Sequence, residues 1–273
     1  MNKIGIQRII SMVLLIMLLL LAVACSTSDT PQAEPVEEEA VVEQSPAATH
    51  TPLPNTATPV PSPTDTAVPE VTPTSTPEAD PRQILGSPVW GAVFTDGTQT
   101  WFQYDDANGK AEVRDNMLVL TSYRANGFDN WSMSYQPMTD FYLELRFTTG
   151  PECSGKDRFG ILFRAPDSTQ GYLYNVACDG SYQVRLWDGE AFTELIGWTV
   201  NEHIVPGPDV EHRLGVWAEG DQYELYVNGF LVGEFSDSTY VKEGSFGAAY
   251  AAADTENFTV DVTEARVWNL PNE

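Results

Sequence analysis

Residues 223–233 have the sequence Tyr-Glu-Leu-Tyr-Val-Asn-Gly-Phe-Leu-Val-Gly, and this stretch decides the fold. Apolar side chains stand at the alternate positions Tyr223, Leu225 and Val227, which is the period of a β-strand with one buried face. The pair Asn228-Gly229 comes directly after them. Both residue types accept a positive φ, so such a pair closes a two-residue turn. The stretch therefore predicts a β-hairpin.

The same period-2 alternation recurs on both sides of this hairpin. It is found in the segments 141–147, 159–163, 182–186, 214–218 and 258–262. Turn sequences of the Asn-Gly or Asp-Gly type separate the segments, at 108–109, 179–180 and 188–189. One buried face per strand is typical of antiparallel sheets, and many short strands with regular turns favour a sandwich. We therefore predict that residues 84–270 form an all-β domain, a jelly-roll sandwich of two antiparallel sheets.

Further segments of this block carry a family resemblance. Phe159-Gly-Ile-Leu-Phe-Arg-Ala-Pro166 is followed by Gly171-Tyr-Leu-Tyr174, and Gly244–Ala249 precedes a closing strand that ends at Arg266-Val-Trp268. Together with the hairpin, these segments resemble concanavalin A-like lectin and glucanase domains, in particular laminin-G-like modules and 3-keto-disaccharide hydrolase-type domains. The resemblance implies a jelly roll of two curved sheets whose concave face often holds sugars. A fold of this kind hosts many functions, so the resemblance alone does not name one.

The first 25 residues form a separate unit. Lys3 and Arg8 precede an apolar run from Ile9 to Val23, and small residues lead to Cys25. This order is typical of a secretion signal. The cysteine makes the segment similar to bacterial lipoprotein signals, in which it is acylated, although Ala22 stands where that family usually has leucine. We predict a signal peptide over 1–24, lipidation of Cys25 as the only membrane attachment, and a location in the cell envelope on the outer face of the membrane. An uncleaved transmembrane anchor is the alternative.

Residues 25–83 differ in composition from the rest of the chain. Between Arg8 and Arg82 there is no Lys or Arg, and the segment from 26 to 81 has Thr-Pro pairs and no aromatic residue. Such a segment buries too little apolar surface to offset the entropy of ordering it. We predict that, after the lipidated cysteine, it is a disordered, acidic, Thr/Pro-rich linker.

The charge of the chain excludes one class of partner. There are 14 Lys and Arg residues against 39 Asp and Glu, a formal net charge of −25. This field repels the phosphates of nucleic acids and anionic lipid headgroups. We therefore predict no nucleic-acid partner.

Two cysteines remain once Cys25 is assigned to the anchor. An even pair in an exported protein predicts a disulfide, here between Cys153 and Cys178. Two free buried thiols are the alternative.

Arginine and aromatic side chains mark a candidate ligand-binding face. They stand opposite the apolar positions of their strands, and one sheet face would carry them if those strands are neighbours: Arg164, Arg185, Trp187, Trp217 and Tyr226. Such a face is a candidate glycan groove, since small-ligand sites combine aromatic rings with a few polar groups. A face covered by a loop, with Arg stacked on Trp for stability, is the alternative.

Signs of catalysis are weak, and a cofactor has one candidate site. A retaining glycosidase needs two carboxylates close together. Laminarinase-like members of the superfamily that this chain resembles carry them in a Glu-x-Asp-x-x-Glu pattern on one strand. Glu219, Asp221 and Glu224 have this spacing, but they flank a turn instead of following one strand, so we interpret them as a solvated acidic turn. Many laminin-G-like sandwiches hold calcium, and Asp105, Asp106 and Asn108 are the candidate ligands. Ordinary turn formation by Asp and Asn is the alternative.

These features predict a lipid-anchored, lectin-like module at the cell surface that binds extracellular or cell-wall carbohydrate without cleaving it. No cofactor other than calcium is expected. Two alternatives stay open: a protein-interaction, adhesion or sensor ectodomain, and a glycoside (keto-sugar) hydrolase.

Overall fold

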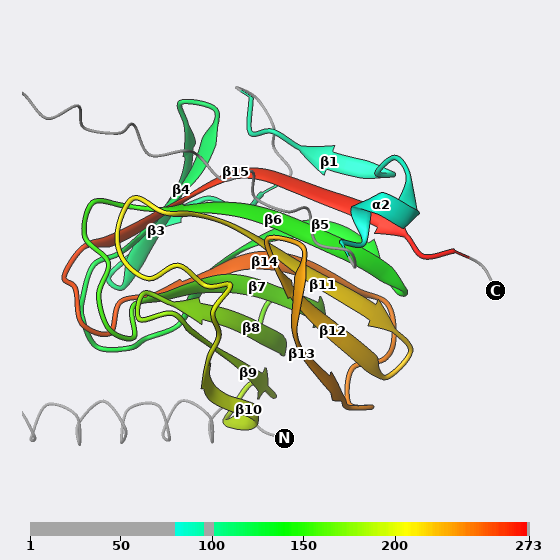
Figure 1. The fold of residues 1–273 in the computed structure, drawn as a ribbon. Helices are drawn as coiled ribbons and strands as arrows, with labels where there is room; N and C mark the ends of the chain where they lie inside the picture. Colours follow the sequence, from blue (N-terminus) through cyan, green and yellow to red (C-terminus); the bar gives the residue numbers. More distant parts are fainter. Residues whose placement is uncertain (1–79, 96–100, 272–273) are drawn as a thin grey trace, which may run out of the picture. The chain divides into compact units, whose positions relative to one another are not determined.

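The computed structural model describes residues 80–95 and 101–271. They form fifteen β-strands and one short helix, α2 (Arg82–Leu85). The strands make two antiparallel sheets that face each other (Figure 1), which confirms the predicted all-β sandwich. The predicted signal peptide, Cys25 and most of the predicted linker lie outside the described residues. Within the part that the structure describes, no helix has the length and apolar character needed to cross a membrane.

The larger sheet has nine strands. In spatial order they are β13 (Phe230–Ser236), β12 (Gln222–Val227), β11 (Glu211–Glu219), β6 (Phe141–Thr149), β15 (Phe258–Asn269), β4 (Met117–Ser122), β3 (Gly109–Arg114) and β2 (Tyr104–Asp105), and β1 (Trp90–Ala92) also pairs with β15. The smaller sheet has six strands. Its order is β10 (Phe192–Val200), β9 (Ser181–Trp187), β8 (Gly171–Ala177), β7 (Arg158–Ala165), β14 (Gly244–Ala251) and β5 (Asn130–Met138).

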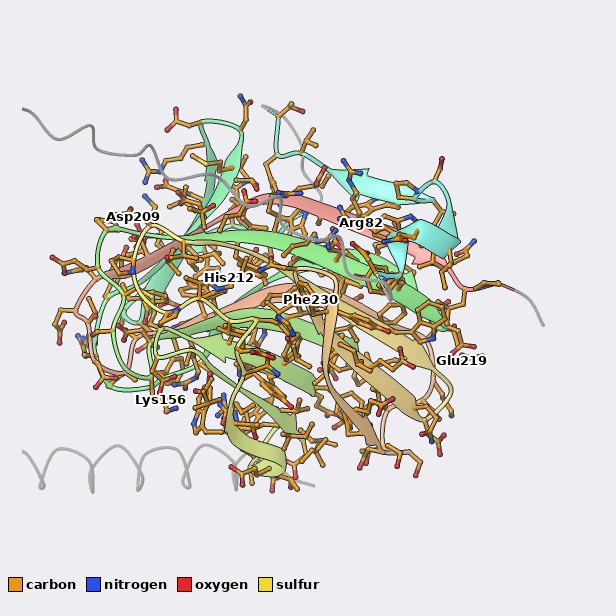
Figure 2. All side chains as sticks on the ribbon, in the orientation of Figure 1. Arg82, Lys156, Asp209, His212, Glu219 and Phe230 are labelled. Atoms are coloured by element: carbon orange, nitrogen blue, oxygen red, sulfur yellow. A yellow bond between two sulfur atoms is a disulfide. The ribbon has the colours of Figure 1, made fainter. Side chains whose placement is uncertain are left out.

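One apolar core fills the space between the sheets (Figure 2). The alternate positions predicted to face inward are all buried, in both sheets. Leu143, Leu145 and Phe147 enter from the nine-stranded sheet, and Phe159 and Ile161 meet them from the six-stranded sheet. The rings of Phe147 and Phe159 lie 5.3 Å apart, centre to centre. Burial of these two inner faces is the main stabilising term of the domain.

The hairpin at β12 and β13 has the predicted turn. Asn228 has φ 54° and Gly229 has φ 89°, so both central residues are left-handed, as a type I′ turn requires. A side chain at Gly229 would also meet Asp80 Oδ2 at 2.6 Å. Glycine is therefore needed here both for its backbone conformation and for the close approach of Asp80.

The disulfide between Cys153 and Cys178 is present, as predicted, with a Cα–Cα distance of 5.5 Å. It joins the segment before β7 to the end of β8. Both cysteines are buried.

The segment that leads into β1 packs on the outer face of the nine-stranded sheet (Figure 2 labels Arg82). Asp80 is buried, and its Oδ2 accepts a hydrogen bond of 2.7 Å from Arg213 Nη2 on β11. Arg213 Nε lies 3.4 Å from Glu144 Oε2 on β6. The indole of Trp268 donates to the carbonyl of Gly86, 3.0 Å away. Residues 80–86 are thus held against the sheet by buried polar contacts.

Buried Glu144 makes the stability of the fold depend on pH. Burial raises the pKa of its carboxyl from 4.5 to about 7, although nearby Arg82 opposes the shift. When the pKa of a carboxyl is higher in the folded state, its contribution to stability is fully present at a pH below the pKa of the unfolded state. That contribution is lost as the pH rises through the pKa of the folded state. The stability of the wild type relative to Glu144→Gln should therefore fall by about 3 kcal/mol between pH 4.5 and pH 7.5.

Urea unfolding of both proteins at several pH values measures this difference. Asp261, whose pKa burial also raises, is present in both proteins, so its contribution cancels. A stability difference that stays constant across this range would show that the pKa of Glu144 is not raised in the folded protein.

Candidate functional site

The five predicted ligand-binding residues do not share one face. Arg164, Arg185 and Trp187 lie on β7 and β9 of the six-stranded sheet, whereas Trp217 and Tyr226 lie on β11 and β12 of the nine-stranded sheet. The prediction of a single sheet face was therefore wrong. Alternation along a strand tells inward from outward positions, but it does not tell which sheet a strand joins.

Trp217 and Tyr226 belong to an aromatic cluster on the outer face of the nine-stranded sheet. Tyr142 lies between them, with its ring centre 5.8 Å from that of Tyr226 and 6.4 Å from that of Trp217. Leu85 of α2 packs against the cluster, and Tyr226 is buried. The segment that precedes β1 thus covers part of this cluster.

Arg164 is buried and serves the structure. It lies in a β-bulge between β7 and β14 and has φ 53°, so its side chain leaves the outer face of the sheet. Its guanidinium bonds Asp140 Oδ1 at 3.0 Å, and the carbonyls of Gly220 and Val241 at 3.2 Å each. With 1% of its surface exposed, it is not available to a ligand.

Arg185 and Trp187 keep an outward position on β9. The Arg185 guanidinium lies 4.2 Å from the ring centre of Phe192, and Trp187 packs on the same ring at 4.5 Å. Arg185 Nη2 also bonds Asp129 Oδ1 at 2.8 Å, which Arg158 Nε shares at 2.9 Å. Asp129 in turn lines a surface cleft, so Arg185 supports that cleft through a single residue.

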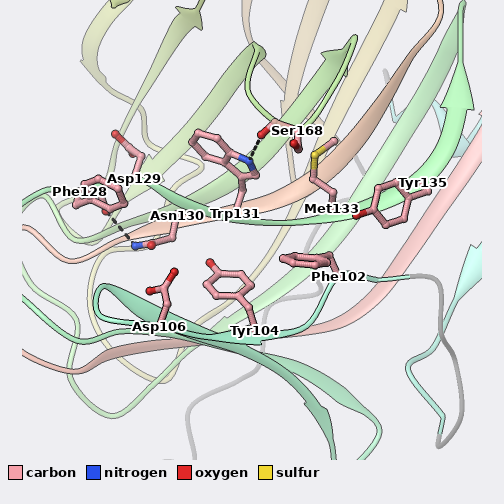
Figure 3. A pocket seen from close by; sticks show the side chains of 10 residues that line it. All are labelled: Phe102, Tyr104, Asp106, Phe128, Asp129, Asn130, Trp131, Met133, Tyr135 and Ser168. Atoms are coloured by element: carbon pink, nitrogen blue, oxygen red, sulfur yellow. Dashed lines mark hydrogen bonds between the residues drawn. The ribbon is translucent and has the colours of Figure 1, made fainter. Parts of the chain in front are cut away.

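This cleft, of about 520 Å³, lies between β5 and the segment that contains β2 (Figure 3). Phe102, Tyr104 and Asp106 project from one side toward the β5 side chains, which include Trp131 and Tyr135. The remaining lining residues are Phe128, Asp129, Asn130, Met133 and Ser168. We call this the aromatic cleft.

Three rings of the aromatic cleft are unusually exposed. Tyr135 is 64% exposed, Phe128 51% and Phe102 50%. Phe102 also stacks on Tyr104, with ring centres 5.8 Å apart. Aromatic side chains lower the free energy of the fold when they are buried, so soluble domains rarely leave several of them exposed together. A group of exposed rings is typical of an interaction site.

Backbone pairing holds the two walls together. The amide of Phe102 donates to the carbonyl of Met133 at 2.8 Å, and Ser132 Oγ donates to the carbonyl of Phe102 at 2.6 Å. Trp131 Nε1 donates to the carbonyl of Ser168, 3.0 Å away, in the turn between β7 and β8. The rings are therefore attached to a rigid frame, which lowers the entropy lost when a ligand binds.

Two polar groups of the aromatic cleft, on Tyr104 and Asp106, are held in place by hydrogen bonds within the protein. The Tyr104 hydroxyl lies 2.7 Å from that of Tyr250, and burial raises the pKa of Tyr104 to about 12, so it stays protonated. Asp106 Oδ1 accepts from the backbone amides of Asn108 and Gly109 at 2.8 and 3.1 Å. This turn fixes the position of the Asp106 carboxylate at the rim.

Most residues of the aromatic cleft were not predicted from the sequence. Phe102 and Phe128 lie in irregular segments, and Trp131 and Tyr135 lie on β5, which is not among the strands predicted from alternation. The one available signal was the density of aromatic residues between 101 and 135, which no periodicity explains.

The predicted calcium ligands have other partners. Asp105 Oδ1 accepts from the Tyr123 hydroxyl at 2.8 Å, and Asp106 closes the turn that contains Asn108. Among residues 80–95 and 101–271, no three or more His, Cys, Asp or Glu side chains are grouped as metal ligands would be. This geometry corresponds to the alternative of turn formation.

Comparisons with known proteins identify a fold and no family. No protein-family model and no curated protein matches the chain. Among solved structures, the exoplasmic/lumenal domain of VIP36 in a Ca²⁺/Man3GlcNAc-bound form is similar, with a TM-score of 0.51 and 13% identity over 67% of this chain and 89% of that chain. A Bacillus subtilis protein of unknown function with a galectin-like fold has a TM-score of 0.50 and 13% identity, over 67% of this chain and 96% of its own.

A third neighbour is the carbohydrate-binding module CBM66 of Bacillus subtilis. It is 23% identical over 60% of this chain and 94% of its own, with a TM-score of 0.47. Carbohydrate-binding and lectin-like β-sandwiches are thus among the structural neighbours of this chain. At 13% identity, the likeness to VIP36 and to the galectin-like protein establishes the fold alone.

Proposed function

We propose that this protein is a non-catalytic glycan-binding module, tethered to the outer face of the membrane through a lipid on Cys25, and that the aromatic cleft is its binding site. One observation carries the proposal: three aromatic rings at least half exposed line a cleft of about 520 Å³ that also contains fixed polar groups. This volume lies within the range of small-molecule sites. Sugars present apolar C–H faces to aromatic rings and hydroxyls to polar groups, so a cleft of this mixed kind suits them.

The fold gives this proposal independent support. VIP36, whose sandwich is similar, is described with a bound mannose-containing glycan. A carbohydrate is therefore a known ligand of a sandwich of this architecture, although fold alone does not assign a function.

The state of the cleft carboxylates favours binding over cleavage. Asp129 is 5% exposed at its side chain and accepts hydrogen bonds from Arg158 and Arg185. Asp106 Oδ1 already accepts hydrogen bonds from two backbone amides of its own turn. A glycosidase needs one carboxyl that gives a proton and a second that attacks or activates water. Neither role suits a carboxylate that two guanidinium groups already contact.

Removal of one exposed ring tests the assignment of the site. Tyr135→Ala should weaken binding of a glycan by about tenfold, because a stacking surface is lost from the cleft. The fold should be unaffected, since the Tyr135 side chain is 64% exposed. A glycan array finds the ligand, and isothermal titration calorimetry then measures the affinity of wild type and variant.

Trp217→Ala is the matched control, because it removes an aromatic side chain from β11, a strand that contributes no residue to the lining of the aromatic cleft. Its affinity should equal that of the wild type once folding is verified. If Trp217→Ala lost affinity and Tyr135→Ala kept it, the site would lie at the aromatic cluster of Tyr142, Trp217 and Tyr226 instead of the aromatic cleft. If no glycan bound, the protein-interaction alternative would replace this proposal.

A further inference from the structure

The hydrogen-bond polarity of the aromatic cleft restricts the ligand it can take. The Tyr250 hydroxyl donates to the carbonyl of Lys110, 3.0 Å away. It has one proton, so in its contact with Tyr104 it must accept. The Tyr104 proton is therefore used inside the protein, and its oxygen offers only lone pairs to the cleft.

Other polar groups of the aromatic cleft show the same bias. The Trp131 indole N–H donates to the carbonyl of Ser168. One N–H of the Asn130 side-chain amide donates to the carbonyl of Phe128 at 3.2 Å. Carboxylates are acceptors only, which applies to Asp106 and Asp129. The hydroxyls of Tyr135 and Ser168 can donate or accept. A ligand must therefore donate the hydrogen bonds that it makes to Tyr104 and Asp106.

Charge acts in the same direction. Among the residues that the structure describes, no Lys, Arg or His side chain lines the cleft, whereas two carboxylates do. The Asp129 carboxylate is paired with Arg158 and Arg185, but no cation from the described segments is paired with Asp106, which is exposed at the rim. An anionic ligand would meet this carboxylate without a compensating cation.

We infer that the aromatic cleft selects glycans that donate hydrogen bonds and carry no negative charge, and that Asp106 is the residue that rejects uronate and sulfated sugars. The ligand class is thus neutral or amine-bearing sugars. This inference rests on the proposed function and goes further, because it names the class of sugar and the residue that sets it.

The test compares one glycan with its own carboxylated form. An array that contains neutral, amino, uronate and sulfated glycans identifies the neutral polysaccharide that binds best. Oxidation of its C6 hydroxyls to carboxylates then gives the matched anionic probe. The whole protein should bind the oxidised probe about tenfold more weakly than the parent in 150 mM salt, where long-range charge effects are screened.

Asp106→Asn should reduce this discrimination to about threefold or less. Asparagine keeps the oxygen that accepts from the backbone amides, so the turn is preserved. Asp115→Asn is the control, because it removes the same charge from the turn at the opposite end of β3, and it should discriminate as the wild type does.

Each outcome decides a different point. Preferential binding of uronate or sulfated glycans, or equal discrimination by Asp106→Asn and wild type, overturns the inference and leaves the proposed function intact. Absence of binding to every glycan on the array overturns the proposed function and the inference together.

Discussion

Replacing Arg164 by alanine is expected to lower the free energy of unfolding by about 3–5 kcal/mol, through the cavity and the lost hydrogen bonds to backbone carbonyls. The Arg164 side chain is buried, and its hydrogen bonds are accepted by Asp140 and by the backbone carbonyls of Gly220, Val241 and Lys242. Its loss removes the guanidinium from the three carbonyls and opens a cavity. The Asp140 carboxylate, which is 49% exposed, still accepts a hydrogen bond from the amide of Gly220. Guanidinium chloride unfolding, followed by tryptophan fluorescence, measures the change.

Arg146→Ala is the matched control for this prediction. Arg146 faces outward on β6, is 32% exposed at its side chain, and forms an ion pair with Glu211. Its removal should cost less than about 1 kcal/mol, because solvent screens exposed ion pairs. Similar costs for the two variants would show that Arg164 is not the structural anchor that its contacts indicate.

The Arg164 variant also separates a structural role from a ligand-binding role. If Arg164 only supports the fold, its folded fraction should bind glycan as the wild type does. Selective loss of affinity in a stably folded variant would restore Arg164 as a ligand-binding residue.

Removal of the disulfide is the second large effect. The double variant Cys153→Ala, Cys178→Ala should lose about 3.5 kcal/mol of stability, since the bridge closes a loop between positions 25 apart in sequence. The loss arises mainly in the unfolded state, whose conformational freedom the bridge restricts.

Thermal unfolding with and without a reductant measures this loss. Reduced wild type should unfold near the temperature of the double variant, and the variant should not respond to the reductant. A double variant as stable as the oxidised wild type would mean that native packing alone holds these two segments together.

The outcome for β7 shows how far alternation can carry a prediction. Phe159, Ile161 and Phe163 are apolar at every second position, and all three face the core. The same alternation places Arg164 outward, but the bulge at that residue breaks the period. A bulge depends on pairing with the neighbouring strand β14, which lies far away in sequence, so no local pattern announces it.

The aromatic cleft is a second feature that local sequence patterns do not predict. Its walls come from residues near 102 and near 131, and its outer rim includes Ser168. None of these segments is distinctive by itself. The bridge between Trp101 and Ser134 and the hydrogen bonds beside it bring the walls together. The sequence predicted a binding face on the most regular strands, because periodicity is visible only there.

The sequence by itself determined the class of the fold, the inward-facing residues, the hairpin turn and the cysteine pair, because each follows from local spacing, turn chemistry or a count of residues. Tertiary structure alone decided which strands share a sheet, where Arg164 points and where exposed rings gather. The physical reason is that these features depend on contacts between segments distant in sequence, and such contacts form only when the two sheets close on each other.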